Sequence, residues 1–122
     1  IAAAKLGSAK VIGVDLDAVA VKVAQENVLI NKVENIMEIR EGNLFDVIHE
    51  QADIVVANII ADIIIELSKD VEKFIKSGGI FIASGIILDR LEDVKGALKL
   101  QNIEILSIKT MGEWAAICCT LQ

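Results

Sequence analysis

Two polar side chains stand directly after short apolar runs of this sequence. Asp15 follows the run that starts at Val11, and Asn58 follows the run that starts at Ile54. We expect both runs to be buried strands of an α/β sheet. Because ligands of such sheets bind beyond the carboxyl ends of the strands, Asp15 and Asn58 are candidates for one shared ligand-binding crevice.

Asp15 has the chemistry to bind a ribose. An ionised carboxylate fixed at a strand end can accept hydrogen bonds from both ribose hydroxyls. Asp17, two residues later, is a second candidate for contact with a cofactor. The alternative is that both aspartates only cap the helix that follows. Dinucleotide dehydrogenases place an acid similarly, so the acid alone does not identify the cofactor.

Asn58 is the candidate for the reacting centre. Its side-chain amide has no hydrogen-bond partner in a helix or turn of its own segment. Its oxygen can accept a hydrogen bond from a substrate amine. The same oxygen can instead accept from the amino-acid part of a cofactor. The alternative is an asparagine that caps a loop.

Asn43 and Leu44 follow the next predicted strand and would border the same crevice. The Asn43 amide can bind an adenine amino group, with Leu44 against the ring. The alternative is an ordinary turn at Gly42-Asn43.

Four other reactive or aromatic residues are expected to be structural. His49 is the lone histidine in a polar stretch, so we expect it at the surface and predict no metal site. Cys118 and Cys119 are adjacent in a predicted strand and point to opposite faces, so we expect two buried thiols without a disulfide. Trp114 is expected to pack in the core or at the sheet edge.

Strands and helices alternate along the chain. The expected strands cover residues 10–15, 35–40, 53–58, 79–84, 103–109 and 113–121, and the expected helices cover 1–6, about 17–31, 62–76 and the segment around 88–98. This alternation predicts an α/β fold with a doubly wound, mostly parallel sheet. The short link 110–112 predicts a C-terminal antiparallel hairpin. Apolar residues recur at helical spacing in two of these helices. They are Val19, Ala20, Val23, Ala24 and Val28 in the helix 17–31, and Leu88, Leu91, Val94 and Leu98, expected on the inner face, in the helix around 88–98.

Composition narrows the class of protein further. Hydrophobic residues make up 54% of the chain and the mean hydropathy is +0.58, but the apolar runs are short and broken by charges. We therefore expect no membrane association. A net charge of −6 gives no basic stripe for phosphates, so no direct nucleic-acid partner is expected. Two unpaired thiols and no secretory signal favour the cytoplasm.

Taken in order, six segments resemble the family of bacterial ribosomal protein L11 methyltransferases, which are class I enzymes dependent on S-adenosylmethionine. The resemblance covers essentially the whole chain. The segments are Ile1-Ala-Ala-Ala-Lys-Leu-Gly7, Val11-Ile-Gly-Val-Asp15-Leu-Asp17, Asn58-Ile-Ile-Ala61, Ser77-Gly-Gly79, Ser84-Gly-Ile86 and Gly112-Glu-Trp114.

This resemblance implies a Rossmann-like sheet with the central strand order 3-2-1-4-5, closed by a hairpin. It implies methyl transfer to amino groups of the ribosomal protein, both lysine side chains and the N-terminal amine. Asp15 matches the ribose-binding acid of the family, and Asn58 matches the asparagine beside the reactive centre. Asn43 stands where many relatives carry an acid near the adenine.

The family's first strand and its glycine-rich loop would precede Ile1 and are not in this sequence. That strand would lie between the strands ending at Asp15 and Asn58. We therefore expect residues 1–122 to be a partial methyltransferase domain that is inactive alone and can self-associate through exposed strand edges. The alternatives are a non-catalytic methyltransferase-like module and a domain of a nicotinamide-dependent dehydrogenase.

Overall fold

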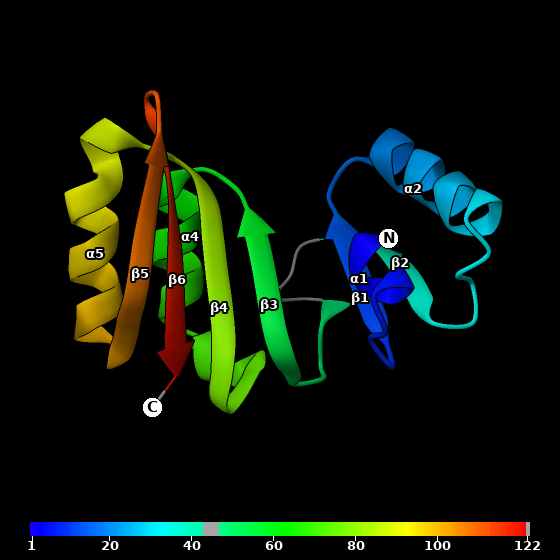
Figure 1. Ribbon diagram of the computed structural model, residues 1–122, viewed down its shortest axis with the longest axis horizontal. Helices are drawn as coiled ribbons and strands as arrows, with labels where there is room; N and C mark the ends of the chain where they lie inside the picture. Colours follow the sequence, from blue (N-terminus) through cyan, green and yellow to red (C-terminus); the bar gives the residue numbers. More distant parts are fainter. Residues whose placement is uncertain (43–46, 122) are drawn as a thin grey trace. The chain divides into compact units, whose positions relative to one another are not determined.

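The computed structural model describes residues 1–42 and 47–121. They fall into two compact units, residues 1–48 and 49–122, each of which is considered by itself. In chain order the elements are α1 (Ala2–Lys5), β1 (Val11–Asp15), α2 (Ala18–Ile30), β2 (Met37–Glu41), β3 (Ala52–Asn58), α4 (Ala61–Ser68), the 3-10 helix η1 (Val71–Lys73), β4 (Ile75–Ile87), the 3-10 helix η2 (Leu88–Arg90), α5 (Leu91–Leu100), β5 (Ile103–Met111) and β6 (Trp114–Leu121) (Figure 1).

The first unit is a β1–α2–β2 crossover preceded by α1. β1 and β2 pair in parallel, with Val11 opposite Met37 and Asp15 opposite Glu41. A small core forms where α1, α2 and the segment before β2 bury Ala4, Val28 and Val33; the apolar side chains packed against it are Val11, Ile36, Met37 and Ile39. Because the two strands run in the same direction, their carboxyl ends lie at the same edge.

The buried face of α2 agrees with the prediction at Val28 but not at Val19 and Val23. Val21 and Val28 are buried, whereas Val19 is 69% exposed and Val23 is 49% exposed. Val21 and Val28 are seven residues apart and therefore share one side of the helix. Since valines and leucines occupy both sides of α2, helical spacing alone did not identify the side that packs.

The second unit is a four-stranded sheet in the order β3-β4-β6-β5. β3 and β4 are parallel, and β6 is antiparallel to both of its neighbours. Helices α4 and α5 pack against each other and against the sheet (Figure 1). Fully buried side chains fill the space between the helices and the sheet, among them Ile64, Leu67, Phe81, Val94, Leu98, Ile117 and Cys119.

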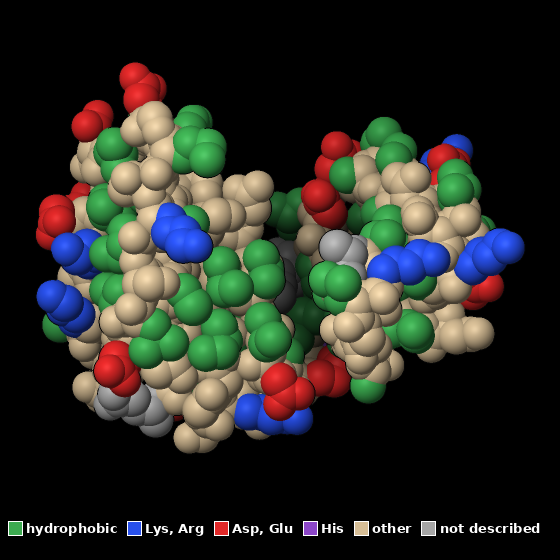
Figure 2. Space-filling view, in the orientation of Figure 1, with side chains coloured by type: hydrophobic (Ala, Val, Ile, Leu, Met, Phe, Trp, Pro, Cys, Tyr) green, Lys and Arg blue, Asp and Glu red, His purple; other side chains and the backbone are tan. Residues whose placement is uncertain are grey.

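The opposite face of this sheet carries exposed apolar side chains. Ile54 and Val56 of β3 lie opposite Ile80 and Ile82 of β4, and Figure 2 shows hydrophobic side chains gathered over these strands. Ile54 and Val56 are exposed, as is Leu106 of β5. In the described part of this unit, the helices therefore cover one face of the sheet.

The strand orders agree with the expected topology. β1 and β3 are each the edge strand of their own sheet within the described ranges. Without its strand 1, the predicted order 3-2-1-4-5 leaves two pairs, 3-2 and 4-5. These correspond to the observed pairs β2-β1 and β3-β4. The α/β class, the parallel pairs and the C-terminal antiparallel hairpin are confirmed.

The predicted helix 62–76 is too long. Helix α4 ends at Ser68, η1 follows, and Ile75 already belongs to β4, where it pairs with Ala52. Phe74 and Ile75 are both buried, as the spacing implied. The backbone of Phe74 instead accepts a hydrogen bond from Ala52 (2.7 Å), so sheet pairing overrides the helical pattern here. The next helix, α5, starts at Leu91, and Leu88 lies before it in η2. Val94 and Leu98 are buried, as predicted, whereas Leu88 is exposed.

The cysteines are unpaired, but only one is fully buried. The Cys119 thiol lies under the helices and donates a hydrogen bond to the carbonyl of Phe81 at 3.2 Å. Burial raises its pKa to about 12. Cys118 points to the opposite face and is half-buried, so the prediction of two buried thiols is wrong for Cys118.

His49 and Trp114 both lie at the surface. His49 is exposed, as expected. Trp114 is 56% exposed and lies at the start of β6 rather than in the core.

None of the described helices is long and apolar enough to cross a membrane.

Two leucines of α5 form a matched pair that tests the position of this core. Leu98→Ala in the intact protein should lower the free energy of unfolding by about 2–5 kcal/mol, because Leu98 is fully buried. Leu100→Ala, at an exposed position of the same helix, should change it by less than about 0.5 kcal/mol. Urea unfolding measures both, and equal losses would contradict the assigned core.

The two thiols should differ in reactivity. Because the raised pKa leaves Cys119 protonated far above neutral pH, its alkylation by iodoacetamide at pH 8 should be negligible in the folded protein. Cys118, which is partly exposed, should be labelled under the same conditions. Mass spectrometry of peptides from labelled Cys118→Ser and Cys119→Ser variants separates the sites. Rapid labelling of Cys119 in native protein would contradict its burial.

Candidate functional site

Asp15 lies at the carboxyl end of β1, as predicted, and its side chain is exposed. One carboxylate oxygen, Oδ1, accepts a hydrogen bond from the backbone N–H of Asp17 at 2.9 Å. The backbone carbonyl of Asp15 accepts another from the N–H of Gly42, also at 2.9 Å. The carboxylate is thus held in one orientation at the strand end while remaining open to a ligand.

Asp17 caps helix α2. Its side chain accepts a hydrogen bond from the N–H of Val19 at 2.9 Å. This is the structural alternative that the sequence left open for Asp17. A contact between Asp17 and a cofactor therefore stays a prediction, and Asp15 is the stronger of the two candidates.

Asn43 and Leu44 lie outside the described residues. Their predicted contacts with an adenine stay predictions. The backbone on either side is described: Gly42 follows β2 and Val47 stands on the far side.

Asn58 ends β3 and pairs with Ser84 of β4. Its side chain is exposed, and within the described ranges no hydrogen bond engages its amide. Ile59, the next residue, donates its backbone N–H to the carbonyl of Ser84 at 3.3 Å. The strand end is therefore tied down while the Asn58 amide remains available to a ligand.

Gly85 leaves the room that the Asn58 side chain occupies. Its φ is +78°, and a Cβ atom built there would lie 2.5 Å from Oδ1 of Asn58. The register between β4 and β6 also shifts at this point, between Ala83 and Ile86. A side chain at position 85 would have to displace the Asn58 amide, so the absence of one leaves room for the amide here.

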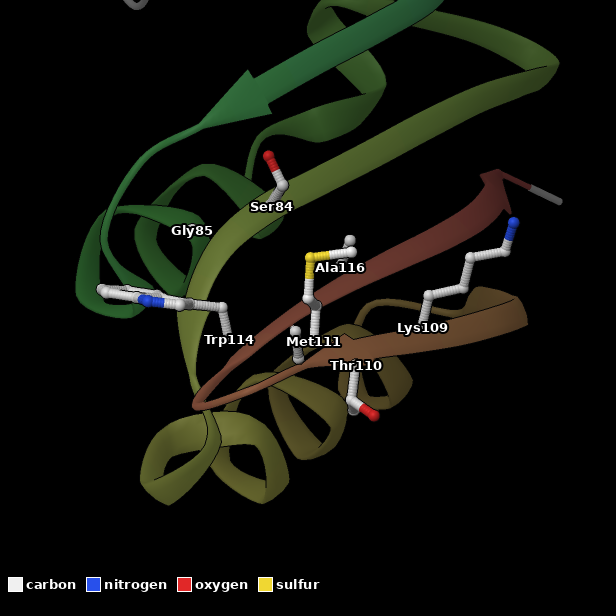
Figure 3. A pocket seen from close by; sticks show the side chains of 8 residues that line it. Ser84, Gly85, Lys109, Thr110, Met111, Trp114 and Ala116 are labelled. Atoms are coloured by element: carbon white, nitrogen blue, oxygen red, sulfur yellow. The ribbon is translucent and has the colours of Figure 1, made fainter.

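A concavity of about 480 Å³ adjoins Gly85 (Figure 3). Trp114 and Lys109 extend in different directions from the hairpin, with Met111 between them. Both Trp114 and Met111 are strongly exposed. The walls are mostly apolar and come from Ser84, Gly85, Lys109, Thr110, Met111, Trp114, Ala115 and Ala116.

The sequence prediction did not assign this concavity. Because β6 runs antiparallel to β4, it begins where β4 ends, with Trp114 opposite Ile87. That register brings the hairpin to the edge where Asn58 lies. The available signal was the segment Gly112-Glu-Trp114, which fits a turn followed by an exposed aromatic residue.

Each unit therefore presents one predicted site residue at the carboxyl end of its parallel strands. In the first unit it is Asp15, and in the second it is Asn58, beside Gly85 and the concavity. A crevice that joins Asp15 and Asn58 stays a prediction. Among residues 1–42 and 47–121, no cluster of three or more metal-binding side chains is found.

Two glycines of the second unit test the close approach at Asn58. Gly85→Ala should lower the free energy of unfolding by about 1–3 kcal/mol, because φ is +78° and the new Cβ collides with Oδ1 of Asn58. Gly78→Ala, at nearly the same φ of +79° but with no atom within 4 Å of the new Cβ, should lower it by less, because only the backbone strain remains. Equal effects in urea unfolding of the intact protein would refute the close contact.

Comparison with known proteins gives consistent matches. The family model for ribosomal protein L11 methyltransferase matches residues 1–122. A curated ribosomal protein L11 methyltransferase of Alkaliphilus metalliredigens is 61% identical over 122 residues. That alignment covers 100% of this chain and 38% of the relative, so the chain spans well under half of that protein's length.

Solved structures show the same fold. The crystal structure of a ribosomal protein L11 methylase from Lactobacillus delbrueckii subsp. bulgaricus aligns with a TM-score of 0.92 and 26% identity, over 99% of this chain and 62% of that one. An RNA methyltransferase from Salinibacter ruber, solved with S-adenosyl-L-homocysteine, has a TM-score of 0.75 and 18% identity, over 98% and 70% of the two chains. At that identity the likeness concerns the fold alone.

Proposed function

The chain belongs to the ribosomal protein L11 methyltransferase family, and we propose that the intact protein transfers methyl groups from S-adenosylmethionine to amino groups of ribosomal protein L11. The acceptors are lysine side chains and the N-terminal amine. The observation that carries the proposal is the exposed Asn58 amide at the end of β3, held beside Gly85 and an apolar concavity.

Asp15 would hold the nucleoside half of the cofactor. Its carboxylate is exposed at the end of β1 and has one oxygen oriented by the N–H of Asp17. Hydrogen bonds from two ribose hydroxyls to such a fixed carboxylate favour the bound adenosine. Asn43 and Leu44 are the proposed contacts to the adenine, and Asp17 contributes through its position at the start of α2.

Asn58 would orient the attacking amine. S-adenosylmethionine supplies a methyl group already activated on a sulfonium, so the protein's task is mainly to align donor and acceptor. The Asn58 oxygen can accept a hydrogen bond from the amine and direct its lone pair toward the methyl carbon. An amide is too weak a base to remove the proton of a lysine, whose ordinary pKa is about 10.4.

The concavity offers an apolar surface for the acceptor side chain. Its walls include Trp114 and Met111, which are both exposed. Because these walls are open to solvent, the acceptor ammonium would lose its proton to water before the attack. The aliphatic part of an acceptor lysine would lie along these walls, with its nitrogen toward Asn58.

The remaining expectations concern the whole protein. The intact enzyme is proposed to act in the cytoplasm on a ribosomal protein, without direct contact to nucleic acid. The edges of β1 and β3 are where self-association of this fragment would occur.

Replacing Asn58 tests its role at the reacting centre. Asn58→Ala in the intact protein should lower kcat about 100-fold, because alignment of the amine is lost, and should change the Kd for S-adenosylhomocysteine less than about threefold. Methyl incorporation into purified L11 gives kcat, and calorimetric titration gives Kd. Asn27→Ala, at an exposed position of α2, is the control. Unchanged turnover would remove Asn58 from the reaction, and no methylation by wild-type protein would favour a non-catalytic module.

A pair of aspartate variants tests the ribose contact. Asp15→Ala should raise the Kd for S-adenosylhomocysteine at least about tenfold, since a charged hydrogen-bond acceptor is removed. Asp17→Ala removes a helix cap and should lower the free energy of unfolding by about 1 kcal/mol, with a smaller effect on Kd. Titration and thermal unfolding of both variants measure the difference. Equal binding by Asp15→Ala and wild type would exclude a ribose contact.

A further inference from the structure

Arg40 of β2 contacts the backbone of Val47. Its Nη1 atom donates a hydrogen bond to the carbonyl of Val47 at 2.7 Å. The Arg40 side chain is only 20% exposed. A charged group that is largely withdrawn from water needs well-placed acceptors, so this contact is a built feature of the first unit.

Glu38 orients the guanidinium of Arg40. Residues 38 and 40 are two apart on β2 and share a face of the strand. Nε and Nη2 of Arg40 donate to Oε1 and Oε2 of Glu38, both at 3.2 Å. Paired contacts of this kind fix the plane of the guanidinium as well as its position, which leaves Nη1 directed at Val47.

The same contact brings Val47 against Gly42. Gly42 has a φ of +136°, and a Cβ atom built there would lie 2.6 Å from Cγ1 of Val47. Only glycine fits between the end of β2 and this valine. Arg40 and Gly42 therefore hold Val47 from two sides, one through its carbonyl and the other through its side chain.

Gly42 in turn is hydrogen-bonded to Asp15, the proposed ribose-binding residue. Its backbone N–H donates to the carbonyl of Asp15 at 2.9 Å, one residue beyond the pairing of Asp15 with Glu41. A chain of contacts thus runs from the Arg40 guanidinium through Val47 and Gly42 to the residue that carries the carboxylate. Every member of this chain lies in the first unit.

We propose that Arg40 is a positioning residue for cofactor binding, which it supports by clamping Val47 onto Gly42 and so fixing the backbone of Asp15. This inference rests on the proposed function, because it assumes that Asp15 binds the ribose. Arg40 itself does not touch the cofactor. Its loss should weaken binding of the nucleoside half without changing the acceptor side of the reaction.

The test uses the intact protein and S-adenosylhomocysteine as the probe. Arg40→Gln, which removes the charged hydrogen bond to Val47 together with both contacts to Glu38, should raise the Kd measured by calorimetry about tenfold. At saturating cofactor, kcat and the KM for L11 should stay within about twofold. Arg40→Lys keeps the charge but not the paired contact with Glu38, and should fall between Arg40→Gln and wild type.

The other arginine of the chain is the matched control. Arg90 also pairs with carboxylates, those of Asp62 (2.7 Å) and Asp93 (2.9 Å), in the second unit. Arg90→Gln should leave Kd within about twofold, even where it lowers the melting temperature. If both arginine variants lose stability and neither changes Kd, Arg40 is merely structural and the inference is wrong.

The glycine contact provides a second, independent readout. Gly42→Ala should raise Kd, because its Cβ collides with Val47, and Val47→Ala in the same protein should recover part of the loss by removing the colliding Cγ1. A double variant as weak as Gly42→Ala alone would count against the clamp. Failure of folded wild-type protein to bind S-adenosylhomocysteine would instead overturn the proposed function and this inference with it.

Discussion

Parallel strand pairing is the constraint on which the rest of this structure depends. The hydrogen bonds between β1 and β2, and between β3 and β4, bring the carboxyl ends of each pair to one edge. The last residue of such a strand lies at this edge, where its side chain is exposed. Asp15 and Asn58 occupy those last positions, so one backbone pattern exposes both the acid and the amide.

The antiparallel strand β6 adds what the parallel strands lack. Because it runs opposite to β4, its first residue, Trp114, comes to the edge where β4 ends. Gly85 of β4 has no side chain, which leaves room for the Asn58 amide beside this strand. An exposed polar group, an apolar wall and a close backbone contact thus meet within the second unit, and this combination suits binding of a long amine-bearing side chain.

The sequence predicted the features that depend on local pattern, and the misses depend on tertiary contacts. Strand ends at Asp15 and Asn58 follow from apolar runs that stop at a polar residue. The spacing of Ile75 fits a helix, but pairing with Ala52 places it in β4. Aromatic residues usually pack, which predicts Trp114 in the core or at the sheet edge, yet the register of β6 exposes it. The inner side of α2 could not be chosen because both sides are apolar.

The central proposal is that Asp15, the last residue of β1, binds the ribose of the cofactor and that Asn58, the last residue of β3, orients the attacking amine. A crystal structure of the intact protein with S-adenosylhomocysteine tests it most directly. The account predicts both ribose hydroxyls within about 3 Å of the Asp15 carboxylate and the sulfur atom on the side of the Asn58 amide. A ribose bound away from Asp15, or a sulfur atom remote from Asn58, would contradict it.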